Sequence, residues 1–389
     1  MTIELADIMR RFGPLYLQRF SASMPVSHQR ALLDIQRCRT EAMGGHVYQC
    51  DDCGQRLYVY HGCRNRHCPA CHREQTSKWL DQRTSELLPC DYFHVTVTLP
   101  QTLRAVFRSN QRALYSLLMR TANDALIQLA DDPKHLGARV GILAVLHTWA
   151  SNLTYHPHVH LLVTGGGVDP QDCWVPCKNK YLVPVRALSR LIRGKLAGRL
   201  KKNYPALYQQ VDPATWTKDW VVHSLHYGQG PMAVLNYLGR YVFRIAITNH
   251  RILSMDDTHV TFKYKDRQTG KWKTQKLQGC EFIRRYLQHV LPKGFHKVRY
   301  YGLWHPSHRH YVKKLIASWA VAEEMPEPPS TPEPQESTTE NTHDQTLKCP
   351  HCGSEQLQLI ITLPRPRARS PSRPMAPVIL TTTSYDRSR

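Results

Sequence analysis

The chain has 389 residues, of which 41% are hydrophobic, so it can bury the core of two or more domains. Its 52 lysines and arginines against 30 acidic residues give a net charge of +22 with histidine neutral, which makes nucleic acid the first partner to consider. No apolar run reaches the roughly 18 residues of a membrane span, and the N-terminus lacks a signal-peptide core. We therefore expect a cytoplasmic protein with no membrane partner.

Composition divides the chain into four parts. Residues 1–90 carry seven of the 12 cysteines, and residues 91–325 are predicted to form a mixed domain of helices and strands. Residues 326–345 are rich in Pro, Glu, Ser and Thr, which predicts a disordered linker. Residues 346–389 contain one C-x-x-C pair and end in a basic tail, which we predict to be largely disordered.

Paired cysteines are the first motif along the chain. Cys50 and Cys53 form one C-x-x-C pair, and Cys68 and Cys71 form a second pair 14 residues later. A reducing cytoplasm argues against a disulfide framework, whereas four thiolates from two tight turns suit a structural Zn²⁺ ion. These four residues are the predicted zinc ligands.

Further soft ligands surround the two pairs. A second zinc ion could use Cys38, His46, Cys63 and His67. Arg64 and Arg66 lie in the same basic stretch, so we predict that residues 1–90 form a zinc-binding module that contacts DNA. A purely structural zinc module is the alternative.

The second part alternates predicted strands and helices. In residues 91–100, Phe93, Val95, Val97 and Leu99 share one face of a strand. Strands are also predicted at 141–150, at 158–166 as an antiparallel partner, at 219–228, and in a hairpin over 259–277. Helices are predicted at 101–130, 187–202, 231–246 and 281–291.

Alternating histidines occupy residues 156–160, in the sequence HPHVH. Residues two apart on a strand point the same way, so His158 and His160 are predicted to form a rigid half-site for a divalent metal. His147, on the neighbouring predicted strand, is the best third ligand; Asn152 and His156 are weaker candidates. The same letters loosely match histidine-triad nucleotide hydrolases, in which a histidine is the nucleophile.

Two tyrosines lie one helical turn apart in the predicted helix 231–246. Tyr237 and Tyr241 are spaced i and i+4 and are predicted at the edge of a buried stripe, with Arg240 and Arg244 beside them. The buried stripe comprises Val234, Leu238, Val242 and Ile245. A phenol flanked by guanidinium groups is well positioned to meet a phosphate. Simple packing of the two rings is the alternative.

Together, the histidines and tyrosines suggest phosphoryl-transfer chemistry. A tyrosine can attack DNA phosphorus, release a 3′-hydroxyl and remain joined to the 5′-phosphate. Mg²⁺ or Mn²⁺ bound by His158 and His160 would polarise the phosphate. Two tyrosines would let one hold a donor strand while the other acts on a second strand.

The combined motifs closely resemble the insertion-sequence 91 family of transposases over roughly residues 25–320. The matching stretches are CRNRHCPACH, HPHVH followed by glycines, and YLGRYV followed two residues later by arginine. The resemblance implies an α+β HUH nuclease fold, in which a central antiparallel sheet flanked by helices follows a small zinc-binding domain. It also implies that residues 91–325 are the two-tyrosine catalytic domain.

By the same resemblance, His158 and His160 are ligands of the catalytic metal, and Tyr237 and Tyr241 are nucleophiles. The implied enzyme cleaves and joins single-stranded DNA at insertion-sequence ends, also binds double-stranded DNA, and associates with the bacterial nucleoid. A replication initiator or relaxase would use the same chemistry and is the runner-up. A non-catalytic zinc DNA-binding protein is the alternative from a different class.

Overall fold

The computed structural model describes residues 3–71, 88–230, 234, 237, 241, 242, 244–266, 269–322 and 347–365. The chain divides into two compact units. The larger comprises residues 1–36 and 62–340, and the smaller comprises residues 37–61 and 341–389. None of the helices in the described ranges has the length and apolar character that a bilayer span requires.

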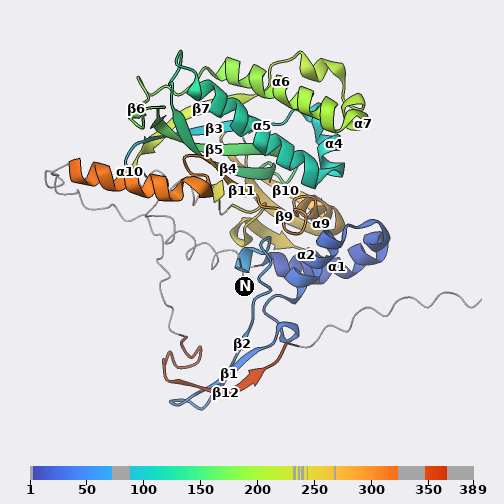
Figure 1. Cartoon of the computed structure of the whole chain (residues 1–389). Coiled ribbons are helices and arrows are strands. Elements are labelled where there is room, and N and C mark those ends of the chain that lie inside the picture. The colour runs from blue at the N-terminus through green and yellow to red at the C-terminus, as the bar shows by residue number, and fades with distance from the viewer. Residues whose placement is uncertain are drawn as a thin grey trace, which may run out of the picture. The chain divides into compact units, whose positions relative to one another are not determined.

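A six-stranded antiparallel sheet forms the centre of the larger unit (Figure 1). Its strands run in the order β11, β4, β5, β3, β7, and the short β6 pairs with β5. The bounds are β3 Asp91–Thr98, β4 Arg139–Trp149, β5 Tyr155–Val168, β6 Trp174–Pro176, β7 Val222–Gln229 and β11 Val298–Gly302. The predicted antiparallel pairing of residues 141–150 with 158–166 is confirmed.

Helices cover one face of this sheet (Figure 1). They include α4 (Arg104–Ser109), α5 (Gln111–Asp131) and α6 (Val185–Asn203), followed by α7 (Pro205–Gln209). Alternate apolar residues of three strands join them in the main core. These strand residues are Phe93, Val95, Val97, Ile142, Ala144, Leu146, Val159, Leu161 and Val163. The opposite face of the sheet is therefore left to the intervening side chains, the histidines among them.

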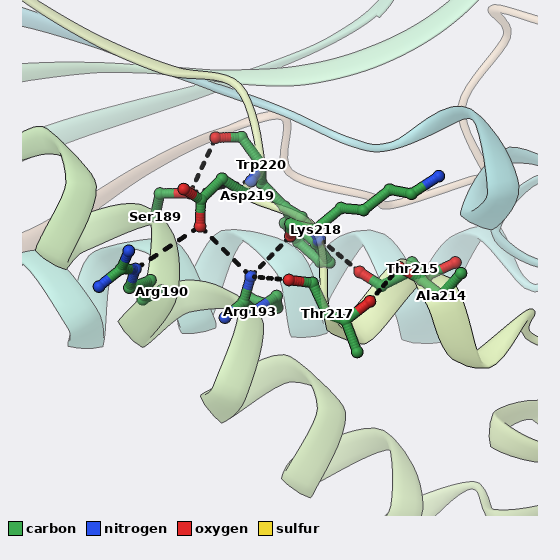
Figure 2. Close-up of polar contacts among 9 residues, drawn as sticks. All are labelled: Ser189, Arg190, Arg193, Ala214, Thr215, Thr217, Lys218, Asp219 and Trp220. Atoms are coloured by element: carbon green, nitrogen blue, oxygen red, sulfur yellow. Dashed lines mark hydrogen bonds and ion pairs between the residues drawn. The ribbon is translucent and has the colours of Figure 1, made fainter.

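Polar contacts attach α6 to the segment that leads into β7 (Figure 2). The Ser189 hydroxyl donates to the Trp220 carbonyl at 2.8 Å and accepts from the Trp220 amide at 3.0 Å. The Arg193 guanidinium donates to the carbonyls of Thr217 and Lys218 at 3.1 and 2.7 Å. Because β7 starts at Val222, these contacts position the strand that borders β3.

Further elements of the larger unit precede the strands of this sheet, lie between β7 and β11, or follow β11 in the sequence. Helices α1 (Leu5–Phe20) and α2 (Val26–Arg37) open the chain, and α10 (Arg309–Ala322) follows β11. A second sheet has the order β10, β9, β8, with β8 Ile252–Met255, β9 His259–Lys265 and β10 Trp272–Gln278. The predicted hairpin is confirmed as β9 and β10, and α9 (Gly279–Leu287) follows it.

Two predictions differ from the observed elements. The helix predicted over 101–130 is interrupted at Asn110, which separates α4 from α5. Residues 357–363, predicted as part of a disordered tail, form strand β12 (Leu357–Leu363) in the smaller unit. Pairing explains the second difference, because β12 lies antiparallel to β1 (Gly45–Cys50), which also pairs with β2 (Arg56–Tyr60). The predicted linker at 326–345 lies outside the described residues.

Candidate active site

Three histidines meet on the sheet face opposite α5 and α6. His158 and His160 lie on β5, and His147 lies beside His158 on β4. All three side chains are buried, and their nearest ring nitrogens lie within 4.8 Å of one another. The period-two alternation of the strands produces this arrangement, since the residues between them face the apolar core.

Carbonyl acceptors fix the orientation of two of these rings. The Nε2 atom of His147 donates to the Tyr241 carbonyl at 2.7 Å, and the Nδ1 atom of His158 donates to the His156 carbonyl at 2.7 Å. A nitrogen that donates to a carbonyl carries the proton, so the other nitrogen is the one able to bind a cation.

Burial favours the neutral form of two of these histidines. It lowers the pKa values of His147 and His160 well below the usual 6.5, and the neighbouring imidazoles lower them further. Neutral imidazole is the form that binds metals. The three histidines offer one ring nitrogen each, and the two whose pKa values are lowered are in the form that binds a divalent metal ion.

His94 supports the group from β3, and sequence reasoning missed it. Its Nε2 atom lies 2.8 Å from Nδ1 of His160, and burial lowers its pKa to about 4. The Thr96 hydroxyl lies 3.1 Å from the same His94 nitrogen. A polar partner on the far side of a ligand ring is the usual support of a metal-binding histidine.

Tyr241 lies directly against the histidines. Its ring centre is 4.4 Å from that of His160 and 4.5 Å from that of His94, and its side chain is partly exposed. The Tyr237 ring packs against the Tyr241 ring, with ring centres 4.9 Å apart and ring planes tilted by 40°. The structure therefore brings together the predicted histidines and the predicted tyrosines.

The prediction that both tyrosines lie at the edge of a buried face is wrong for Tyr237. Its side chain is 0% exposed and packs with Tyr92, Leu143, Val145 and Leu162. Burial raises its pKa well above the usual 10. Within the described part of the chain its hydroxyl has no hydrogen-bond partner. Val234 and Val242 are buried as predicted, whereas Leu238 and Arg240 lie outside the described residues.

Positive charge adjoins this group. The charge of Arg244 contributes to the lowered pKa values of His147 and His160, and the Lys297 ammonium donates to the Arg244 carbonyl at 3.3 Å. Burial, with a smaller contribution from Arg66, lowers the pKa of Lys297 to about 8. The site thus combines neutral ligands, a phenol and two cations.

Comparisons with known proteins identify the family of the chain. Residues 141–311 match a family model described as "Putative transposase", and residues 8–99 match one described as "Transposase zinc-binding domain". The chain is 38% identical over 377 residues to "Putative transposase y4qJ" of Sinorhizobium fredii, covering 91% of this chain and 94% of the relative. The chain belongs to the insertion-sequence 91 family of transposases.

A second relative points the same way. The transposase is 31% identical over 279 residues to "Transposase for insertion sequence element IS801" of Pseudomonas savastanoi pv. phaseolicola, covering 68% of this chain and 67% of the relative. No solved structure matches the chain. As a family member the transposase is a DNA-processing enzyme with an N-terminal zinc-binding domain.

Within the described ranges, cysteines of the transposase form two groups, and neither is the predicted one. In the larger unit Cys63, Cys68 and Cys71 gather, and the sulfurs of Cys63 and Cys71 lie 3.7 Å apart. Cys50 and Cys53 gather instead with Cys349 and Cys352. The two predicted pairs therefore belong to different groups, because β12 brings a third C-x-x-C pair to the end of β1. Both groups are suited to structural zinc.

The other predicted ligands of a second zinc ion lie elsewhere. The Nε2 atom of His67 accepts from the Leu291 amide at 3.4 Å, and the His46 ring lies against His61. Arg66, predicted to bind DNA, donates to the carbonyls of Pro292 and Phe295 at 3.0 and 2.5 Å. Arg64 is exposed.

Proposed function

We propose that this transposase nicks and rejoins single-stranded DNA at the ends of an insertion sequence through a 5′-phosphotyrosine intermediate. The observation that supports it most directly is the contact of Tyr241 with His160, one of three buried histidines whose ring nitrogens are grouped closely enough for a metal ion. A divalent ion bound there would polarise the scissile phosphate and stabilise its developing charge. His147, His158 and His160 are the proposed ligands.

In the first step the Tyr241 hydroxyl loses its proton and its oxygen bonds to phosphorus. The bond from phosphorus to the 3′-oxygen breaks, and the released oxygen takes up a proton from solvent to become a 3′-hydroxyl. The phosphodiester energy is retained in the tyrosine–phosphate bond. A 3′-hydroxyl of another strand can then attack phosphorus, restore a phosphodiester and release Tyr241.

Tyr241 is the proposed first nucleophile because its side chain is partly exposed and adjoins the histidines. Tyr237 is fully buried and its pKa is raised, so its hydroxyl is a poorer nucleophile in this arrangement. Tyr237 would act second, on a strand admitted after its hydroxyl is uncovered.

The charge of the protein fits a single-stranded DNA substrate. The chain carries a net charge of +22, and Lys297 and Arg244 lie beside the histidines. Cations at this position would hold the phosphates that flank the cleaved one. Three nitrogen ligands form a softer set than the oxygen shells typical of Mg²⁺, so Mn²⁺ is the first ion to test.

The decisive experiment uses DNA labelled on one side or the other of the cleavage site to detect a covalent protein–DNA adduct. A single-stranded element end is incubated with the protein and Mn²⁺ and run on a denaturing gel. A label on the 3′ side of the cut should migrate with the protein, and a label on the 5′ side should leave as a shorter free strand. Tyr241→Phe should abolish the adduct, whereas Tyr181→Phe, at an exposed loop tyrosine, should leave it unchanged.

Two outcomes would contradict the proposal. An adduct that survives in the Tyr237→Phe/Tyr241→Phe double variant would exclude both nucleophiles. A phosphohistidine in place of phosphotyrosine would favour the histidine-triad chemistry. When an acceptor strand with a 3′-hydroxyl is added, the protein should join the donor end to it.

A further inference from the structure

Two short segments, almost 300 residues apart in the chain, have the same local structure in the smaller unit. Their sequences are CDDCGQ at 50–55 and CPHCGS at 349–354. In the first, the Gly54 amide donates to the Cys50 carbonyl at 2.9 Å and the Cys50 amide donates to the Gln55 carbonyl at 3.0 Å. The second repeats both bonds, from Gly353 to Cys349 at 2.8 Å and from Cys349 to Ser354 at 2.7 Å.

Glycine is required at the same point of both turns. Gly54 has φ +69° and Gly353 has φ +79°, a conformation that L side chains rarely adopt. Each turn therefore presents its two cysteine side chains, Cys50 and Cys53 or Cys349 and Cys352, to the same group. Matching turns of this kind are the usual way in which proteins present thiolates to zinc.

The strands bring the two turns face to face. β1 ends at Cys50 and β12 begins at Leu357, and Cys50 is paired with Leu357 in the register of the two strands. The Asp51 amide also donates to the Gln356 carbonyl at 3.0 Å. The turns thus extend from the same end of an antiparallel pair.

The distances between the sulfur atoms are closer to those around one tetrahedral zinc ion than to the bond lengths of two disulfides. The Sγ atoms of Cys50 and Cys352 are 3.6 Å apart, as are those of Cys53 and Cys349, and all four lie within 4.8 Å. Tetrahedral zinc with bonds of about 2.3 Å holds its sulfurs roughly 3.8 Å apart. A disulfide would require about 2.05 Å.

We propose that Cys50, Cys53, Cys349 and Cys352 bind a second structural Zn²⁺ ion, forming a zinc ribbon from two distant segments of the chain. Neither family model includes Cys349 or Cys352, since the models match residues 8–99 and 141–311. The inference does not depend on the proposed nuclease chemistry. Its consequence is that the metal fastens residues 347–365 to the β1–β2 hairpin.

Thiol labelling of the wild-type protein tests the site without any substitution. Cys53, Cys352 and Cys173 are all exposed, and Cys173 belongs to no cysteine group among the described residues. With N-ethylmaleimide and mass spectrometry, Cys173 should react at once, whereas Cys53 and Cys352 should react only after a chelator removes zinc. Immediate labelling of Cys53 and Cys352 would overturn the proposal, and so would protection that a reductant removes but a chelator does not.

Zinc counting provides the second test. Relative to wild type, Cys349→Ser/Cys352→Ser should lose one zinc per chain, and a chain ended after Gln345 should lose the same one. The matched controls are Cys173→Ser/Cys177→Ser and a chain ended after Arg365, which should both keep it. Unchanged zinc content in the Cys349→Ser/Cys352→Ser protein would overturn the assignment.

Discussion

His94 and His160 are joined by a 2.8 Å hydrogen bond between ring nitrogens on adjacent strands. If His160 binds a metal through Nε2, its Nδ1 carries the proton and donates to His94. His94 would then hold the ligand ring in orientation and increase its basicity. His94 acts through His160, so it is a positioning residue.

We predict that His94→Leu weakens metal binding more than chemistry. The Mn²⁺ concentration that gives half-maximal adduct formation should rise about 10- to 100-fold, and saturating Mn²⁺ should restore much of the rate. His94→Gln, whose amide can still accept the bond, should recover part of the affinity, and His135→Leu at an exposed loop is the control. An unchanged Mn²⁺ dependence in His94→Leu would remove this role.

Tyr237→Phe should not destabilise the protein. The variant deletes a buried hydroxyl that has no partner among the described atoms, so the free energy of unfolding should stay level or rise by up to about 1 kcal/mol. Tyr92→Phe is the matched comparison, because the Tyr92 hydroxyl donates to the Leu88 carbonyl at 2.7 Å and accepts from its amide at 3.1 Å. That variant should lose about 1–3 kcal/mol in denaturant unfolding. Equal losses in the two variants would contradict the account.

The metal-free protein should lose stability as the pH falls from about 7 to 4. Burial lowers the pKa values of His94 and His289 to about 4, whereas both are near 6.5 in the unfolded chain. The unfolded state therefore takes up protons first, and the stability present above pH 6.5 is lost as the pH falls toward 4. Each group accounts for about 3 kcal/mol.

Denaturant titrations in chelator at pH 7 and pH 4 measure this loss. His289→Gln removes one of the two groups, so its unfolding free energy should change less between the two pH values than that of wild type. A variant with the same pH dependence as wild type would show that His289 titrates normally in the folded protein.

Substitutions of Arg66 and Arg64 should have different effects, the first on stability and the second on DNA binding. Arg66→Ala removes the guanidinium that donates to the Pro292 and Phe295 carbonyls and should cost about 2–3 kcal/mol in unfolding free energy. Arg64→Ala should reduce the salt dependence of DNA binding by about one unit of slope. Melting curves and DNA binding at several salt concentrations measure the two effects. Unchanged stability in Arg66→Ala, or an unchanged salt dependence in Arg64→Ala, would refute the assignment.

Strand periodicity made much of the sheet and the histidine group predictable. The alternation that assigned Phe93, Val95 and Val97 to the core also assigns Tyr92, His94 and Thr96 to the other face. His94 could have been found from that same pattern. It was missed because a single histidine in a strand carries no spacing signal of its own.

The cysteine groups were not predictable in the same way. Spacing identifies a C-x-x-C turn, but three such pairs occur here and only the strand pairing determines which two share an ion. Likewise, helical spacing correctly brought Tyr237 and Tyr241 to one side. The spacing did not reveal that Tyr237 packs against the sheet. Its burial depends on side chains of other strands, which the local sequence does not specify.

The pairing of β1 with β12 also bears on how the protein is made. Gly45 lies opposite Leu363, so the ribosome must add some 300 residues between the first strand and its last partner. At roughly 5–20 residues per second, this takes roughly 15–60 s. The β1–β2 hairpin leaves the ribosome early, and the edge of β1 that pairs with β12 stays unpaired until residues 357–363 have been made. Protease sensitivity of stalled nascent chains at residues 45–60 would measure that interval, and protection there should begin only once residues 357–363 have left the ribosome.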